Sequence, residues 1–177
     1  MPPSGVTVRR ALPGDEPVLR ELRIEALSDA PAAFGSTLER ERVRSPADWA
    51  RWLSPSATFL LYAGSMPSGL AAGVPDATDP VLVWLMAMWV RPALRGSGAA
   101  GLLVEAIVGW AVAVRADRIR LDVVQGNETA RGCYARHGFR PTGHTTIRAR
   151  DGAIEIQMER AVEAPPLDSV SDRKSAI

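Results

Sequence analysis

Apolar and polar residues alternate along the chain in blocks that predict a mixed α/β fold. Short apolar runs bounded by turn residues indicate strands at residues 6–10, 58–63, 70–74, 81–90, 118–124, 142–150 and 154–160. Longer stretches indicate helices at residues 16–28, 45–53, 98–115 and 128–137. Because hairpins are interspersed with strand–helix–strand crossovers, we expect one central, twisted, mixed sheet flanked by helices.

Several element boundaries carry their own signals. Asp15 precedes the first helix, and Ser45-Pro46 begins the second, so Asp15 and Ser45 are predicted N-caps. Gly138 is predicted to end the last helix as a C′ residue. Residues 81–90 are apolar at nearly every position, which is typical of a central strand buried on both faces.

The chain has 177 residues, enough for one domain with a sizeable core. We predict a single domain over residues 1–160 that ends in a hairpin around Asp151-Gly152. Residues 161–177 contain Pro165-Pro166 and mostly polar side chains, which indicates a flexible C-terminal tail.

Charge and composition narrow the classes of function. The 21 basic and 20 acidic residues give a net charge of +1, so nothing favours binding to nucleic acid or to a membrane. One cysteine, Cys133, excludes an internal disulfide, and with only His137 and His144 a metal site is not expected. The chain shows no signal peptide and no apolar run of about 18 residues, so we expect a cytoplasmic protein.

A glycine-rich turn connects the strand at 81–90 to the helix that follows it. Such a turn gathers backbone N–H groups at the positive end of a helix dipole, which is a common way of holding phosphate. We expect the N–H groups of this turn to bind the phosphates and Arg95 either to add charge or to brace the loop. The candidate ligand-binding residues are Arg95, Gly96, Ser97, Gly98, Ala99, Ala100 and Gly101.

Two familiar glycine motifs fit the turn less well. A P-loop requires Gly-Lys-Ser/Thr, and this turn has no lysine. Gly96, Gly98 and Gly101 satisfy the G-x-G-x-x-G dinucleotide pattern, and Asp117 and Asp122 follow at roughly the required distance. That motif normally follows the first strand of a repeating α/β array, whereas this one lies in the middle of the chain.

The segment 95–100 instead reads as Arg-x-x-Gly-x-Ala, and a second motif agrees with it. The strand at 121–124 is followed by Asn127 and Tyr134 in an Asn-x-x-Ala-x-x-x-Tyr helix that ends in Gly138-Phe139. In this order and at this separation, the two motifs resemble those of the GNAT superfamily of GCN5-related N-acetyltransferases. The resemblance extends from about residue 6 to residue 160 and implies the GNAT acyl-CoA N-acyltransferase fold.

The resemblance also implies how acetyl-CoA, the cosubstrate, would bind. The strands at 81–90 and 118–124 should separate, and the pantetheine arm would enter the V-shaped gap. Backbone groups of Met88, Trp89 and Val90 would pair with its amides, and the Met88 N–H would hold the thioester oxygen. Asn127 is expected to cap its helix, to contact the coenzyme, or both.

Tyr134 matches the family tyrosine that protonates the departing thiolate, although it could instead pack its ring on the sheet. A general base is also needed, because an amine of pKa near 10.4 is only about one part in 2,500 uncharged at neutral pH. The candidates are Glu39 and Glu41, after the first helix, and Asp122, on the strand beside the coenzyme. Among them we favour Glu41, then Asp122.

The sequence thus favours an N-acetyltransferase that transfers acetyl from acetyl-CoA to a primary amine by direct attack in a ternary complex. The alternative is a catalytically silent acyl-CoA-binding regulatory module. The amine could belong to a small molecule or a protein, and a homodimer formed through the final hairpin is compatible with the family. A cationic acceptor is expected because the region around the connection between the first two helices is locally acidic, although arginines lie among the acidic residues. The acidic residues are Glu21, Glu25, Asp29, Glu39 and Glu41, and the arginines are Arg20, Arg23, Arg40, Arg42 and Arg44.

Overall fold

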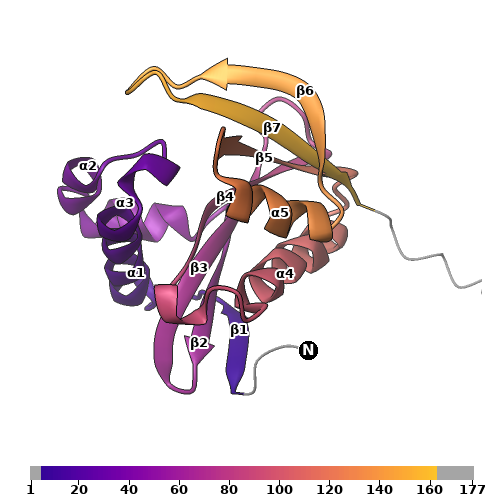
Figure 1. The fold of residues 1–177 in the computed structure, drawn as a ribbon. Coiled ribbons are helices and arrows are strands. Elements are labelled where there is room, and N and C mark those ends of the chain that lie inside the picture. Colours follow the sequence, from indigo (N-terminus) through magenta and orange to yellow (C-terminus); the bar gives the residue numbers. More distant parts are fainter. Residues whose placement is uncertain (1–4, 163–177) are drawn as a thin grey trace, which may run out of the picture.

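The computed structural model describes residues 5–162 and shows a seven-stranded mixed sheet with helices on both faces (Figure 1). The strands are β1 (Val6–Arg10), β2 (Ala57–Ala63), β3 (Met66–Pro75), β4 (Leu82–Val90), β5 (Arg118–Val124), β6 (Arg140–Ile147) and β7 (Ile154–Ala161). Their order in the sheet is β1-β2-β3-β4-β5-β7-β6, and only β4 and β5 run parallel. This confirms the predicted architecture.

The helices form two layers. On one side lie α1 (Glu16–Asp29), α2 (Leu38–Arg42) and α3 (Pro46–Trp52), and on the other lie α4 (Ala99–Ala113) and α5 (Glu128–Arg136) (Figure 1). Each layer encloses its own apolar core, so neighbouring β2 residues serve different cores. Leu60 packs with α1 and Leu61 with α4, because successive strand side chains point to opposite faces.

The first connection differs from the prediction. Between α1 and α3 the chain forms a 3₁₀ turn, Pro31–Ala33, and the short helix α2, neither of which the sequence pattern indicated. Asp15 stands at the start of α1 but does not cap it, because its side chain accepts from the Leu12 N–H and pairs with Arg9. Ser45 does cap α3, and it forms a capping box with Asp48.

The other predicted boundaries hold to within a few residues. β3 begins at Met66 rather than at residue 70, and α4 begins at Ala99, directly after Gly98. Gly138 follows α5 with φ of +83°, as a C′ glycine should. The predicted tail lies outside the described residues except for Ala161, which ends β7, and Val162. No helix within residues 5–162 is long and apolar enough to cross a membrane.

The sheet divides between β4 and β5. The two strands pair only at Leu82–Trp84 with Arg118–Arg120, whereas β5 goes on pairing with β7 as far as Val124. On its other edge, β4 has one residue more than β3 between two paired positions, and there Ala87 has φ of +56°. Such a bulge bends the strand. The edge of β4 from Leu85 onward therefore has no partner on the β5 side, as the predicted V-shaped gap requires.

Candidate active site

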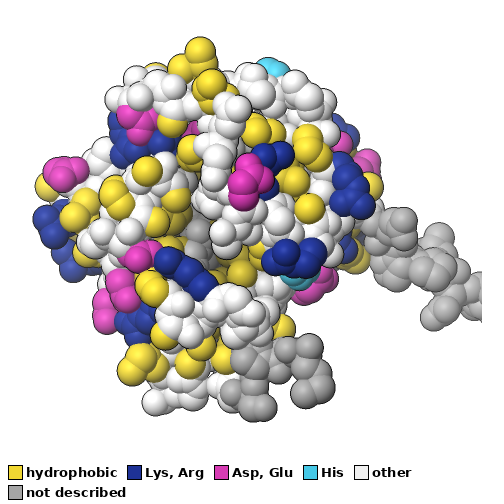
Figure 2. Space-filling model, in the orientation of Figure 1, with side chains coloured by type: hydrophobic (Ala, Val, Ile, Leu, Met, Phe, Trp, Pro, Cys, Tyr) yellow, Lys and Arg dark blue, Asp and Glu magenta, His cyan; other side chains and the backbone are white. Residues whose placement is uncertain are grey.

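A cavity of about 420 Å³ lies where β4 and β5 separate. Its walls come from β4, β5, β7, α1, α2, α3, α5 and the connection after α1. The polar and aromatic residues that line it include Arg23, Phe34, Ser36, Arg40, Glu41, Arg44, Trp52, Trp84, Asp122, Asn127, Tyr134 and Glu155. On the face shown in Figure 2, basic and acidic side chains are interspersed rather than gathered into one patch.

The glycine-rich turn after β4 has the backbone shape of an anion-binding loop. Gly96 and Gly98 have φ of +77° and +91°, which other residues rarely adopt, and a side chain at Gly96 would meet open space. Within residues 5–162, the N–H groups of Gly96, Gly98 and Ala100 have no hydrogen-bond acceptor. The Ala99 N–H reaches only Ser97 Oγ, at 3.4 Å. The turn thus presents free N–H donors at the start of α4.

Arg95 braces this turn. Its Nε donates to the Val90 carbonyl at 3.1 Å, and its Nη2 pairs with Asp29 at the end of α1. Asp29 also accepts from Trp89 Nε1 at 2.9 Å, and these two bonds, with Trp89 the stronger influence, lower the pKa of Asp29. Of the two roles predicted for Arg95, the contacts show the bracing one.

The N–H of Gly101 is not free to bind phosphate, contrary to the prediction. That N–H donates to the Gly98 carbonyl at 3.0 Å. A Cβ at this position would lie 2.5 Å from His137 Nε2, so the glycine makes room for the imidazole at the end of α5. His137 Nδ1 in turn lies 2.8 Å from the Cys133 carbonyl. Gly101 therefore serves the packing of α4 against α5.

The backbone of β4 beside the gap belongs to Met88, Trp89 and Val90. Met88 lines the cavity, whereas the Trp89 and Val90 side chains are buried, one in each core. Side chains packed in this way leave only main-chain groups to face a ligand along the open edge. The predicted pairing with pantetheine thus has a free strand edge available to it.

Asn127 directly precedes α5 and Tyr134 lies within it, as the motif predicts. Asn127 caps the helix, since its side chain accepts from the Ala130 N–H at 3.2 Å, and it also lines the cavity. Tyr134 lines the cavity while its ring, 8% exposed, packs edge-on against Phe139 with 5.8 Å between centroids. Burial raises the pKa of Tyr134, so its hydroxyl keeps its proton at neutral pH.

The carboxylates proposed as bases lie in contrasting surroundings. Asp122 on β5 is open to the cavity, and partial desolvation by the surrounding protein raises its pKa despite nearby His144 and a hydrogen bond with Gln157. Glu41 is only 1% exposed and lies between two arginines, 2.5 Å from Arg44 Nε and 3.7 Å from Arg23 Nη2.

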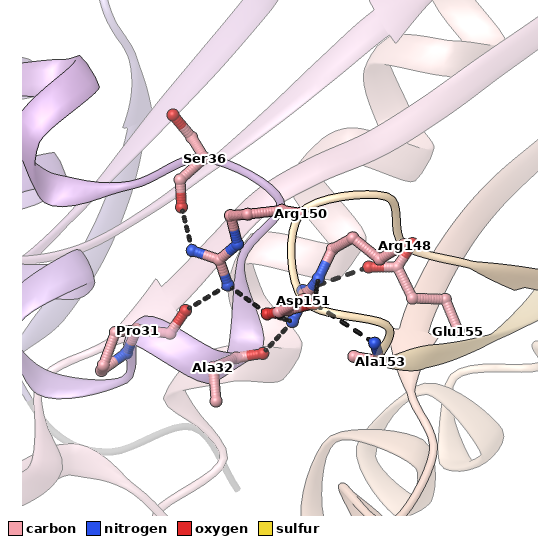
Figure 3. A network of polar contacts seen from close by, with 8 residues as sticks. All are labelled: Pro31, Ala32, Ser36, Arg148, Arg150, Asp151, Ala153 and Glu155. Atoms are coloured by element: carbon pink, nitrogen blue, oxygen red, sulfur yellow. Dashed lines mark hydrogen bonds and ion pairs between the residues drawn. The ribbon is translucent and has the colours of Figure 1, made fainter.

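The turn between β6 and β7 also supports the cavity wall, which the sequence analysis did not predict (Figure 3). Arg148 donates to the Ala32 carbonyl at 2.8 Å while pairing with Asp151 and with Glu155, which lines the cavity. Arg150 donates to the carbonyls of Pro31 and Ser36, each at 3.2 Å. The hairpin thereby fixes the segment after α1 that forms one cavity wall. No local pattern signals contacts between residues more than 110 positions apart.

Within residues 5–162, no three His, Cys, Asp or Glu side chains come together in a way that could hold a metal ion. Cys133 is half-buried, and burial raises the pKa of its thiol, which disfavours the reactive thiolate. The groups that line the cavity are a tyrosine, carboxylates, arginines and backbone amides.

Several solved structures of acetyltransferases share this fold. A GNAT-family acetyltransferase from Streptococcus pneumoniae is 18% identical, with a TM-score of 0.76 over 89% of this chain and 99% of that one. A GCN5-related N-acetyltransferase from Kribbella flavida is 22% identical, with a TM-score of 0.73 over 90% and 99%. The Salmonella typhimurium protein yncA, solved with its cofactor acetyl-CoA, is 17% identical, with a TM-score of 0.71 over 94% and 99%.

The family is also evident in the sequence itself. A model of the Acetyltransferase (GNAT) family matches residues 20–139, more than half of the chain. No curated protein sequence matches this chain. The chain belongs to the GNAT family of acetyltransferases.

Proposed function

We propose that this protein is an acetyl-CoA-dependent N-acetyltransferase that acetylates a primary amine by direct attack in a ternary complex. The observation that carries the proposal is the arrangement around β4. Its open edge borders a cavity with Tyr134 and Asp122 in the wall, and the strand leads directly into a turn with free N–H donors. The structure of yncA with acetyl-CoA, on the same fold, supports the choice of coenzyme.

The residues present fit the coenzyme. Gly96, Gly98 and Ala100 offer N–H donors for a pyrophosphate, and the absence of side chains at the two glycines lets phosphates approach the backbone. The open edge of β4 at Met88 to Val90 would supply amide and carbonyl groups for a pantetheine arm, apart from the Val90 carbonyl, which accepts from Arg95 Nε. Asn127, at the N-terminus of α5, lines the same cavity.

When bound, acetyl-CoA supplies an activated acetyl group as a thioester. Tyr134 is protonated at neutral pH and would donate its Oη proton to the leaving thiolate. Because burial raises its pKa, that transfer depends on the negative charge that develops on the sulfur. We assign the general base to Asp122, which lines the cavity and whose raised pKa lies nearer to that of an ammonium group. Glu41 was the first candidate from the sequence, but it forms ion pairs with Arg23 and Arg44. We therefore assign it to positioning these two arginines rather than to proton transfer.

The test is isothermal titration with acetyl-CoA, using NADH as the control ligand for the dinucleotide alternative. Gly98→Asp places a carboxylate where the phosphates would lie and should weaken acetyl-CoA binding about 100-fold or more, since like charges in contact cost several kcal/mol. The matched control is Gly143→Asp. That glycine also has a positive φ, +86°, with open space around it, but it lies on exposed β6 and does not line the cavity.

Wild-type and Gly143→Asp proteins should bind acetyl-CoA equally and NADH not at all. Equal binding by Gly98→Asp would remove the turn from the coenzyme site. Tight binding of acetyl-CoA without acetylation of any amine in a broad panel would contradict the proposed N-acetyltransferase activity. It would favour a catalytically silent acyl-CoA-binding module.

A further inference from the structure

Arg23 on α1 is the most unusual charged residue of the cavity wall. Its side chain is buried, with 5% of the residue exposed, and it lines the cavity. Neither Nε nor Nη1 has a hydrogen-bond partner within the described residues. Nη2 lies 3.7 Å from Glu41 Oε1, which is too far for a hydrogen bond. A buried guanidinium group with five N–H donors thus has none of them used by this part of the chain.

Aromatic rings cover this guanidinium group. Its central carbon lies 4.7 Å from the centroid of Phe34 and 5.4 Å from that of Trp52, both of which also line the cavity. Such contacts stabilise the cation through the faces of the rings. They use none of its N–H groups, so they leave its hydrogen-bonding capacity free.

The charges at this end of the cavity do not balance. Arg23, Arg40 and Arg44 line it together with a single carboxylate, that of Glu41. Of the acidic residues that led us to expect a cationic acceptor, only Glu41 faces the cavity. Glu25 and Asp29 pair instead with Arg91 and Arg95, and the remaining two, Glu21 and Glu39, do not line it.

A buried guanidinium group without hydrogen bonds is costly, and an anion that accepts from its planar fork offsets that cost. Resting on the proposed N-acetyltransferase function, we infer that the acceptor is a small amine that also carries a carboxylate, and that Arg23 binds this carboxylate. The substrate class is therefore that of amino acids and related aminocarboxylates.

The rest of the cavity agrees with a substrate of this kind. Asp122 lines the same cavity from β5, so a carboxylate is available for the amine while Arg23 is available for the substrate carboxylate. The cavity volume of about 420 Å³ would be shared with the end of the pantetheine arm, which leaves room only for a small acceptor. Arg23 acts as a specificity-determining residue, since it contacts the substrate away from the reacting amine.

The experiment compares acceptors that differ only in the carboxylate. Wild-type protein is assayed for CoA release with each proteinogenic L-amino acid, with its carboxamide, and with the corresponding decarboxylated amine. For the preferred side chain, the acid should exceed both analogues in kcat/KM by about 10- to 100-fold, as expected for a charged hydrogen-bonded pair. This comparison requires no variant.

Variants then assign the preference to Arg23. Arg23→Gln should raise the KM for the acid by a similar factor and abolish the preference over the carboxamide, while the Kd for acetyl-CoA stays within about twofold. Arg23→Lys keeps the charge without the fork and should retain part of the preference. The matched control is Arg20→Gln, on the exposed side of the same helix and away from the cavity.

The outcomes separate the two proposals. Equal or better turnover of carboxamides and plain amines overturns the carboxylate inference and leaves the N-acetyltransferase intact. Binding of acetyl-CoA without turnover of any acid in the panel also overturns the inference. Failure to bind acetyl-CoA overturns the proposed function itself.

Discussion

Gly101 on α4 lies at the end of the glycine-rich segment that we propose binds the coenzyme, but its surroundings indicate a packing role. An alanine Cβ at this position would lie 2.5 Å from His137 Nε2 and 2.9 Å from Cε1. Real carbon atoms do not approach so closely, so Gly101→Ala must displace the imidazole ring. That ring is also tied to the Cys133 carbonyl, 2.8 Å from Nδ1, and the displacement breaks this bond.

The net effect follows from three contributions. Overpacking costs about 1–3 kcal/mol, and a lost hydrogen bond costs about 1 kcal/mol. Replacing a helical glycine by alanine returns about 1 kcal/mol. Gly101→Ala should therefore lower the free energy of unfolding by about 2 kcal/mol. In a His137→Ala background no clash remains, so the same change should raise it by about 0.5–1 kcal/mol.

Urea unfolding of the four proteins measures this double-mutant cycle, and the sign of the Gly101→Ala effect should reverse between backgrounds. An equal effect in both backgrounds refutes the packing role. Titration with acetyl-CoA supplies a second readout. The double variant should bind like the wild type, because the Gly101 N–H is already used by the Gly98 carbonyl. Loss of binding in the double variant would return Gly101 to the coenzyme site.

Two further predictions concern catalysis. Tyr134→Phe keeps the ring against Phe139 and should change the free energy of unfolding by no more than about 0.5 kcal/mol. It should reduce kcat about 100- to 10,000-fold while the Kd for acetyl-CoA stays unchanged. An unchanged kcat would exclude Tyr134 as the proton donor. Because the pKa of Asp122 is raised by desolvation, activity should fall with decreasing pH as this carboxyl takes up a proton, and the fall should begin above the ordinary carboxyl range near pH 4. Asp122→Asn should lower kcat and abolish this acid limb, whereas persistence of the limb would exclude Asp122 as the base.

The parts of the fold that the sequence could predict depend on local chemistry. The turn after β4 needs glycines at positive φ, and the strand–helix boundaries at Asn127 and Ser45 need caps, so each leaves a mark in a short stretch of residues. The seven strands were predictable for the same reason, because apolar runs and the alternation of apolar and polar residues are visible within short stretches of sequence. The gap between β4 and β5 was expected from the family resemblance rather than from any such mark.

The acceptor end of the cavity was harder to predict because contacts between distant segments form it. Helix α2 is five residues long, four of them charged, and carries no apolar periodicity. Glu41 was favoured as a base from its position after the first helix, but its burial between Arg23 and Arg44 appears only in three dimensions. The same is true of Arg148, which reaches Ala32 across the fold.

The separation of β4 from β5 has a consequence for solubility. A strand edge with free amides normally invites pairing with another chain, and proteins guard the perimeter of their sheets against such aggregation. Here the free edge of β4 lies in the interior of the sheet, with β3 on one side and β5, β7 and β6 beyond the gap. A neighbouring molecule would have to thread a strand between two parts of one domain to reach it. The fold can therefore keep an unsatisfied strand edge for a slender ligand without offering that edge to other copies of itself.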